Sequence, residues 1–511
     1  MLKFIENILS AFRSCFSRTR TYEWFLVIVS ALLVRCDSLG VTSLIRALSL
    51  DHRLYETLLH FFRSSAYKTA ELKSRWHEIV HRNAPLIRIG GRPLLLGDGC
   101  KVSKESRRMP GVKKLCQESE DSSKPQFIHG HMFGGIGAAI GNHLNSFCLP
   151  MDLTIQDGLK ETASWIGGNL SASLSHVVQM VRNGHAIAQT FSENVYLALD
   201  RYFLTVPLLM ELKELNKSAA YRLDVITRAK ANCIAYAKLE KKLEPHRGRP
   251  RKKGKSIKVM DLFESRRHDF IAATVFMYGR EQKVEYLSLN LLWGIKLYQE
   301  LQFVLVKYDN VTTILATTDL NLAPTLVIEA YAHRFKIECM FREIKQQIHG
   351  FSYHFWNSKI PKLNKYKKKS DPDPLALIRE EDRPSVLLTI EAIERFVLCS
   401  EISMGIIQMT ALNPAFLTLI IISSVVLGFP QPVSVATPDF AVSKLSREFP
   451  RFQPTLISLT ISEELRKPVE LSLDGFFSVS FFSVGTGAEV SPRLYLTVTE
   501  SRRAVGCSLH Q

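Results

Sequence analysis

The sequence PLLLGDG (residues 93–99) decides the fold class of this chain. It is a run of three leucines that ends at Gly-Asp-Gly, and a short apolar run bounded by turn residues is typical of a strand buried inside a sheet. The sequence VYLALD (residues 195–200) repeats the pattern, with five apolar residues followed by an acid. Further strand-like and helical stretches alternate with these two runs. The pattern therefore predicts an α/β fold in which a mixed sheet is flanked by helices.

The chain outside these two strands divides into segments of different composition. Apolar residues at helical spacing predict a helical N-terminal region, and ten Lys and Arg residues between positions 238 and 258 mark a basic, β-rich insertion. The expected order is the helical N-terminal region, the first part of the core, the insertion, the second part of the core, a basic linker with C-terminal helices, and a tail without recognisable chemistry. Their bounds are residues 1–88, 89–212, 213–300, 301–356, 357–429 and 430–511.

Composition and charge restrict the class of partner. Hydrophobic residues make up 46% of the 511 residues and charged residues 23%, which is typical of a globular protein. The chain has 66 Lys and Arg against 49 Asp and Glu, a formal charge of +17, and this excess favours nucleic acid or an anionic membrane surface as the partner. The nine cysteines form no Cys-x-x-Cys pair, which argues against a zinc knuckle and fits a reducing cytoplasm.

One apolar stretch raises the alternative of a membrane protein. Residues 402–438 contain no charged residue. The pair Asn413-Pro414 divides the stretch and leaves roughly 15 apolar residues before Pro430, fewer than the ~20 that a membrane span needs. We therefore predict two buried helices and no membrane partner.

Three acids occupy positions that suit metal-dependent chemistry. Asp98 and Asp200 each follow an apolar run that predicts a strand, and Glu338 lies on a helix expected over residues 324–349. Carboxylates that meet at one sheet edge repel one another unless a cation neutralises them, and Mg²⁺ and Mn²⁺ prefer such oxygen ligands. The alternative is that each aspartate is an ordinary turn residue.

The sequence YAHRFKIECMFREIK (residues 331–345) gives a sharper signal. On a helix that turns about 100° per residue, four of its polar residues fall within roughly 60° of one another. They are Tyr331, Arg334, Glu338 and Lys345. An acid between two basic side chains suits phosphodiester chemistry, because the acid binds a cation and the basic groups bind phosphates. A solvated face of charged i, i+4 pairs is the alternative.

This spacing, Y-x2-R-x3-E-x6-K, resembles the signature of DDE transposases of the insertion-sequence-four group, and the chain carries it intact. GDGCKVSKESRRMPGVKKL (residues 97–115) and LALDRYF (residues 197–203) resemble the segments around that family's two catalytic aspartates. ATTDLNL (residues 316–322) resembles the strand and turn before its helix. The resemblance covers about residues 20–410, and the long interval before Glu338 is similar to that of members with a β-rich insertion.

The resemblance implies an RNase H-like catalytic core in which Asp98, Asp200 and Glu338 are catalytic and bind two Mg²⁺ ions, with Mn²⁺ as an alternative. One ion would activate a water or a DNA 3′-hydroxyl, and the other would stabilise the leaving oxygen. The implied activity is that of a DNA transposase, a metal-dependent endonuclease and DNA strand transferase that cuts the ends of an insertion element and joins them to target DNA.

The resemblance also implies the partners of the chain. Tyr331, Arg334 and Lys345 would contact the DNA backbone, and the N-terminal region would bind the element ends. Double-stranded DNA is the expected partner, together with a second copy of the chain in a homodimeric synaptic complex, at the nucleoid in the cytoplasm.

A second basic motif lies within the expected insertion. The sequence RGRPRK (residues 247–252) resembles an AT-hook, whose Gly-Arg-Pro core lies in the narrow minor groove of A·T-rich DNA. We therefore expect Arg247, Arg249 and Arg251 to bind DNA, with an ordinary solvated basic loop as the alternative. For the whole chain, the alternatives are a catalytically inactive DNA-binding relative and a membrane-associated basic protein.

Overall fold

The structure is a computed structural model that describes residues 1–117, 125–142, 144–165, 175–239, 252–364 and 372–413, together with two short strands near the C-terminus. The chain forms two compact units, Met1–Phe452 and Gln453–Gln511. The second unit is described only by an antiparallel pair, β14 (Phe477–Ser480) and β15 (Thr497–Glu500). All further description concerns the first unit.

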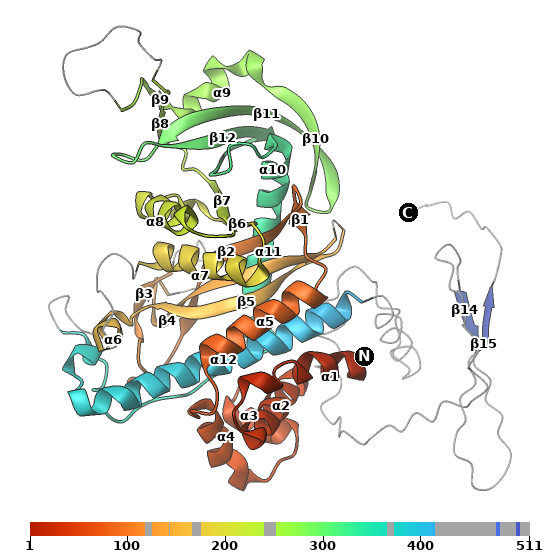
Figure 1. Cartoon of the computed structure of the whole chain (residues 1–511), viewed down its shortest axis with the longest axis vertical. Coiled ribbons are helices and arrows are strands. Elements are labelled where there is room, and N and C mark those ends of the chain that lie inside the picture. Colours follow the sequence, from red (N-terminus) through yellow and green to blue (C-terminus); the bar gives the residue numbers. More distant parts are fainter. Residues whose placement is uncertain are drawn as a thin grey trace. The chain divides into compact units, whose positions relative to one another are not determined.

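The core is a mixed sheet in the order β5-β4-β2-β6-β7 (Figure 1). β4 is antiparallel to both β2 and β5, whereas β6 is parallel to both β2 and β7. These strands are β2 (Arg92–Ser103), β4 (Phe127–Gly141), β5 (Ser146–Asp157), β6 (Val195–Leu199) and β7 (Leu223–Arg228). The short strands β1 (Arg88–Ile89) and β3 (Lys113–Cys116) pair with β2 and β4. The expected α/β fold, a mixed sheet flanked by helices, is confirmed.

Helices cover both faces of this sheet. An added Cβ at Gly97 of β2 would meet Met180 of helix α7 (His176–Phe191), whereas one at Gly135 of β4 would meet Phe341 of helix α11 (Lys336–Gln346). Helix α8 (Val206–Lys217) packs beside α7. Ser175 caps the start of α7 by accepting the backbone N–H of Val178 at 3.4 Å.

The N-terminal region is helical, as its apolar spacing predicts. Its helices are α1 (Leu2–Ser10), α2 (Thr19–Val34), α3 (Val41–Ala47), α4 (Tyr55–Phe62) and α5 (Thr69–Asn83). Trp76 of α5 is fully buried and donates its indole N–H to the carbonyl of Pro150 in β5 at 2.9 Å. In Figure 1, α5 and helix α12 (Arg383–Ala411) cross the sheet side by side at β5.

A second antiparallel group of strands continues the core sheet. β13 (Val311–Thr317) pairs with β7 on one edge and with β12 on the other. The remaining members are β8 (Ile234–Tyr236), β9 (Ser256–Lys258), β10 (Ile271–Met277), β11 (Arg280–Trp293) and β12 (Gln299–Tyr308). The structure thus places β7, from the range expected for the insertion, beside the core strand β6. It places β12, from the range expected for the core, beside β11 in the insertion.

Helix α12 ends where the sequence predicts a break. Its last residue is Ala411, just before Asn413-Pro414, and the second expected helix lies outside the described residues. In the part of the chain that the structure describes, no helix has the length and apolar content of a membrane span.

One acid of α12 is buried against β5. Glu401 is fully buried, and its Oε1 accepts the backbone N–H of Leu153 at 3.2 Å. Nearby, Lys73 of α5 pairs with Asp152 of β5 at 2.6 Å. Burial raises the pKa of Glu401 well above its ordinary value, although the charge of Lys73 opposes this shift.

Glu401 makes the stability of the fold depend on pH. A carboxyl whose pKa is raised by folding binds its proton more tightly in the folded state, so its contribution is full at low pH and is lost as pH rises above the unfolded value. At pH 8 we expect Glu401→Gln to have a free energy of unfolding about 1–3 kcal/mol higher than that of the wild type, as measured by urea unfolding. At pH 4 we expect little difference between the two proteins. Glu56→Gln, at an exposed position of α4, is the control. A Glu401→Gln effect that is equal at both pH values would contradict this assignment.

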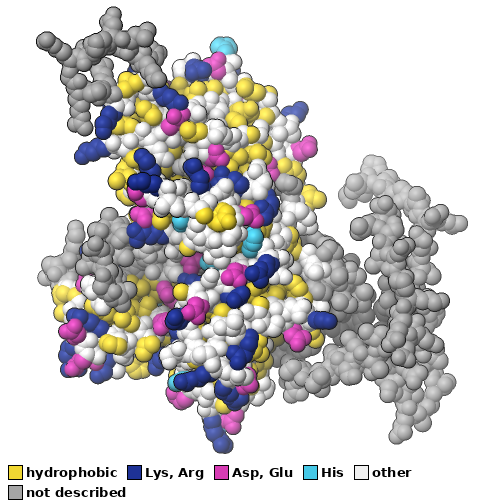
Figure 2. All heavy atoms as spheres, viewed as in Figure 1, with side chains coloured by type: hydrophobic (Ala, Val, Ile, Leu, Met, Phe, Trp, Pro, Cys, Tyr) yellow, Lys and Arg dark blue, Asp and Glu magenta, His cyan; other side chains and the backbone are white. Residues whose placement is uncertain are grey.

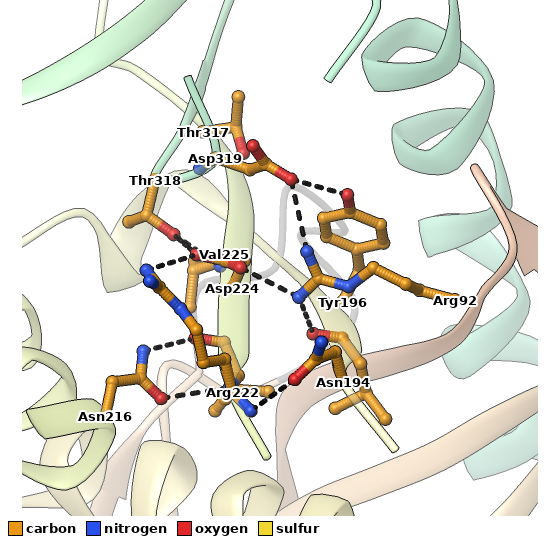
Figure 3. Close-up of polar contacts among 12 residues, drawn as sticks. Arg92, Asn194, Tyr196, Asn216, Arg222, Asp224, Val225, Thr317, Thr318 and Asp319 are labelled. Carbon is orange, nitrogen blue, oxygen red and sulfur yellow. Dashed lines mark hydrogen bonds and ion pairs between the residues drawn. The ribbon is translucent and has the colours of Figure 1, made fainter. Parts of the chain in front are cut away.

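At the amino ends of the parallel strands, an ion-pair network joins β2, β6, β7 and β13 (Figure 3). Arg92 donates to Asp224 at 2.8 Å and to Asp319 at 3.1 Å, and its guanidinium lies 3.9 Å from the ring centroid of Tyr196. Tyr196 donates its hydroxyl to Asp319 at 2.6 Å. The side chain of Asp224 is only 4% exposed, so its charge depends on this pairing.

We expect Arg92→Met to lower the free energy of unfolding by about 2–3 kcal/mol, because it leaves the buried carboxylate of Asp224 without its main partner. Urea unfolding followed by circular dichroism measures the change. Arg222→Met is the matched control, since Arg222 lies 4.0 Å from the same carboxylate but has a side chain that is 62% exposed. Equal losses in the two variants would show that burial of the pair does not matter.

Candidate active site

Asp98 and Asp200 lie side by side at the carboxyl end of the parallel pairing. The register pairs Leu96 with Ala198 and Gly97 with Leu199, so the next residue of each strand is one of the two acids. The expectation that Asp98 ends its strand is wrong, because β2 continues to Ser103 through its pairing with β4. Only β6 ends at this point, and Asp200 begins the 3-10 turn η4 (Arg201–Phe203).

Glu338 reaches the same edge from helix α11, which packs on the face of the sheet that Asp98 and Gly135 share. The helix expected over residues 324–349 is in fact α10 (Pro324–Ala332), a 3-10 turn η7 (His333–Phe335) and α11. Arg334 of η7 donates to Asp98 at 3.1 Å and to Glu338 at 2.5 Å. Its side chain is 15% exposed, against 26% for Asp98 and 45% for Glu338. One guanidinium therefore bridges the first and third predicted acids.

Small residues in β4 allow α11 to approach the sheet this closely. Gly135 is the residue of β4 opposite Asp98, and a Cβ there would lie 2.6 Å from the ring of Phe341. A Cβ at Gly137 would lie 2.3 Å from the sulfur of Cys148 and 3.1 Å from that of Met340. Gly135 and Gly137 of GGIG (residues 134–137) thus allow the helix of Glu338 to lie close to Asp98, a role that no sequence pattern indicated.

The electrostatics of Asp98 reflect the crowding of acids. The pKa of its carboxyl is raised to about 6. Burial is the largest cause and the charges of Asp200 and Glu338 add to it, whereas the backbone N–H of Gly99 and the charge of Arg334 oppose it. The N–H of Gly99 donates to its Oδ1 at 2.7 Å. Bringing these acids together therefore costs free energy, and a bound cation would offset that cost.

The other two signature residues also border β2 and β6. Burial raises the pKa of the Tyr331 hydroxyl to about 12, and the charge of Asp200 contributes to the shift. Lys345 donates to the backbone carbonyl of Lys101 in β2 at 3.1 Å. Tyr331, Arg334, Glu338 and Lys345 thus lie along the edge that carries the two aspartates. Arg247, Arg249 and Arg251 lie outside the described residues.

A buried arginine from the N-terminal region binds the turn that follows α11. Arg35 follows α2, is 3% exposed, and donates to the carbonyls of Ile348 and His349 at 2.6 Å each. Both carbonyls lie in the turn that follows α11, which ends at Gln346, and buried carbonyls of a turn need donors from elsewhere in the fold. Arg35 therefore fixes the helix of Glu338 to the N-terminal region, and no sequence pattern indicated this contact.

The acids provide the ligands that a hard divalent cation requires. Three carboxylates at one edge, two of them partly exposed, suit Mg²⁺ or Mn²⁺ better than softer metals. Within the described ranges, no three His, Cys, Asp or Glu side chains are arranged to hold one ion, and Arg334 lies between Asp98 and Glu338. A search of protein-family models and of curated proteins finds no match to this chain.

Proposed function

We propose that this chain is a DNA transposase of the DDE type, which cuts the ends of an insertion element and joins them to target DNA. The observation that carries the proposal is the gathering of Asp98, Asp200 and Glu338 at one edge of the sheet, beside the basic residues of the signature. These three acids come from strands β2 and β6 and from helix α11, far apart in the sequence. An RNase H-like catalytic core requires three acids at such a place, and the common position of these three beside the β2–β6 pair supports the proposal.

In this proposal Asp98, Asp200 and Glu338 hold two Mg²⁺ or Mn²⁺ ions, which supply an activated oxygen nucleophile and stabilise the leaving oxygen when bound. Arg334 and Lys345 bind phosphates near the cleaved bond as charge-assisted donors. Tyr331 donates its hydroxyl to the DNA backbone.

The DNA partner is supported by the formal charge of +17. On the face shown in Figure 2, Lys and Arg side chains extend over the length of the described region, interspersed with Asp and Glu. We propose that the N-terminal helices bind element ends, that Arg247, Arg249 and Arg251 add contacts to the DNA backbone, and that two copies of the chain pair two ends at the nucleoid. Phosphate contacts of this kind weaken steeply as the salt concentration rises.

The direct test is cleavage of the element's own ends. The full chain is incubated with duplex DNA that spans each junction between the element and its flank, with Mg²⁺, and the cuts are mapped to the nucleotide. We expect cuts at the junctions that disappear when the ion is chelated. Binding without cuts at any Mg²⁺ or Mn²⁺ concentration would instead favour a catalytically inactive DNA-binding relative.

A further inference from the structure

Arg334 occupies the space between the two acids that it bridges. Its two terminal nitrogens donate to different carboxylates, one to Asp98 and one to Glu338. Both oxygens of Asp98 are engaged, because Oδ1 accepts from Gly99 and Oδ2 from Arg334. Each carboxylate oxygen has a second lone pair, so these hydrogen bonds alone do not prevent Asp98 from binding a metal. The guanidinium, however, lies between Asp98 and Glu338, where an ion bound to both carboxylates would lie. A cation that binds both acids must therefore displace Arg334 from this position.

A positive charge at this position also opposes a divalent cation directly. The guanidinium carries its charge at neutral pH and lies within hydrogen-bonding distance of both proposed ligands. Like charges a few ångströms apart repel most strongly where solvent is partly excluded, and Arg334 is 15% exposed. Arg334 and the metal are therefore competitors for the same carboxylates.

A phosphate group offers Arg334 an alternative partner of the same geometry. The planar guanidinium binds the oxygens of phosphate and of carboxylate in the same bidentate manner. A phosphate of DNA bound at this edge can replace the two carboxylates as the partner of the Arg334 guanidinium. The two acids are then free to bind the cation. The rearrangement requires only that one side chain exchange an anionic partner.

From these contacts we infer that Arg334 is a latch that couples DNA binding to metal binding. It holds the carboxylates of Asp98 and Glu338 until a DNA phosphate takes its guanidinium, so that the cation binds strongly only when DNA is present. The inference rests on the proposed function and adds to it an order of assembly. In this order of assembly, the metal-bound nuclease site does not form while the enzyme is free of DNA.

The test measures metal binding without any cleavage. The probe is Mn²⁺, titrated into the full chain without DNA, and the free ion is followed by electron paramagnetic resonance. We expect Arg334→Gln to bind Mn²⁺ roughly tenfold more tightly than the wild type, since removal of one close charge changes the affinity of a neighbouring ionic site by about this factor. Lys345→Gln is the matched control, because it removes the same charge from a residue that contacts the Lys101 carbonyl and neither acid.

The result of this titration distinguishes three possible roles of Arg334. An unchanged affinity in Arg334→Gln would mean that Arg334 serves DNA binding alone, and a weaker affinity would mean that it holds the acids in place for the metal. Either result overturns the latch. Mn²⁺ binding of Asp98→Asn shows whether only the latch is wrong or the proposed function as well. If Asp98→Asn leaves Mn²⁺ binding of the wild type and of Arg334→Gln unchanged, the acids form no metal site and the proposed function itself fails.

The reciprocal measurement tests the DNA side of the latch. Coupling between two ligands must act equally in both directions, so a divalent cation should strengthen DNA binding. With Ca²⁺, which also prefers carboxylate oxygens, we expect a clear gain in affinity for an element-end duplex in the wild type and a much smaller gain in Arg334→Gln. Equal gains in the two proteins would overturn the latch.

Discussion

Asp98→Asn, Asp200→Asn and Glu338→Gln are each expected to lower metal-dependent DNA cleavage by at least ~10³-fold, since under the proposed function each removes one charged ligand from the two metal ions that would activate the nucleophile and stabilise the leaving oxygen. These substitutions keep the size and shape of the side chain and change only its charge. Binding of element-end DNA should remain close to that of the wild type in a chelator, because phosphates are bound by Arg and Lys side chains. Cleavage is measured in single-turnover assays with Mg²⁺.

The chain offers a matched control for these variants. Asp319 also follows an apolar strand, β13, and by position alone it is as good a candidate as Asp98. The structure places it in the network of Arg92 and Tyr196, at the opposite ends of the parallel strands. We expect Asp319→Asn to lower stability and to retain cleavage. A variant of Asp98, Asp200 or Glu338 that still cuts at a near-normal rate would remove that residue from the site.

The contrast between Asp98 and Asp319 shows how far the sequence alone could lead. The apolar run of residues 195–199 predicts the strand β6 with its observed bounds, and the acid after it lies where the pattern indicates. The end of β2 was not predictable in this way, because β2 continues along β4 after β6 has turned away. Pairing with a partner distant in sequence, rather than the local pattern, determines where such a strand ends.

The helix of the signature shows the same limit. No Gly or Pro lies between Pro324 and His349, so periodicity alone predicts one continuous helix. The observed 3-10 turn η7 falls at Arg334, the residue whose side chain reaches across to Asp98. Short 3-10 segments within helices often mark functional sites. The ion pairs of Arg334 and the glycines opposite α11 depend on tertiary contacts that helical spacing does not encode.

A different arginine dominates the expected stability of the fold. Arg395 of α12 is 2% exposed, and its guanidinium lies 4.2 Å from the ring centroid of Tyr67. All three of its nitrogens donate to residues at the junction of α4 and α5 or to its own helix. The acceptors are the carbonyls of Phe62, Ser64 and Tyr67, the hydroxyl of Thr69 and the carboxylate of Glu391, at 2.7–3.1 Å.

Arg395→Met is therefore expected to lower the free energy of unfolding by about 3–5 kcal/mol, because it retains the apolar stem and removes the donors of several buried carbonyls. Urea unfolding gives the loss, and faster proteolysis of the N-terminal helices should accompany it, since Arg395 ties them to α12. Arg379→Met is the control: its side chain is 67% exposed, and ion pairs of exposed side chains contribute little to stability, so a much smaller loss is expected. A loss as small in Arg395→Met would mean that water or other donors replace the guanidinium, and that α12 is held mainly by its apolar packing on β5.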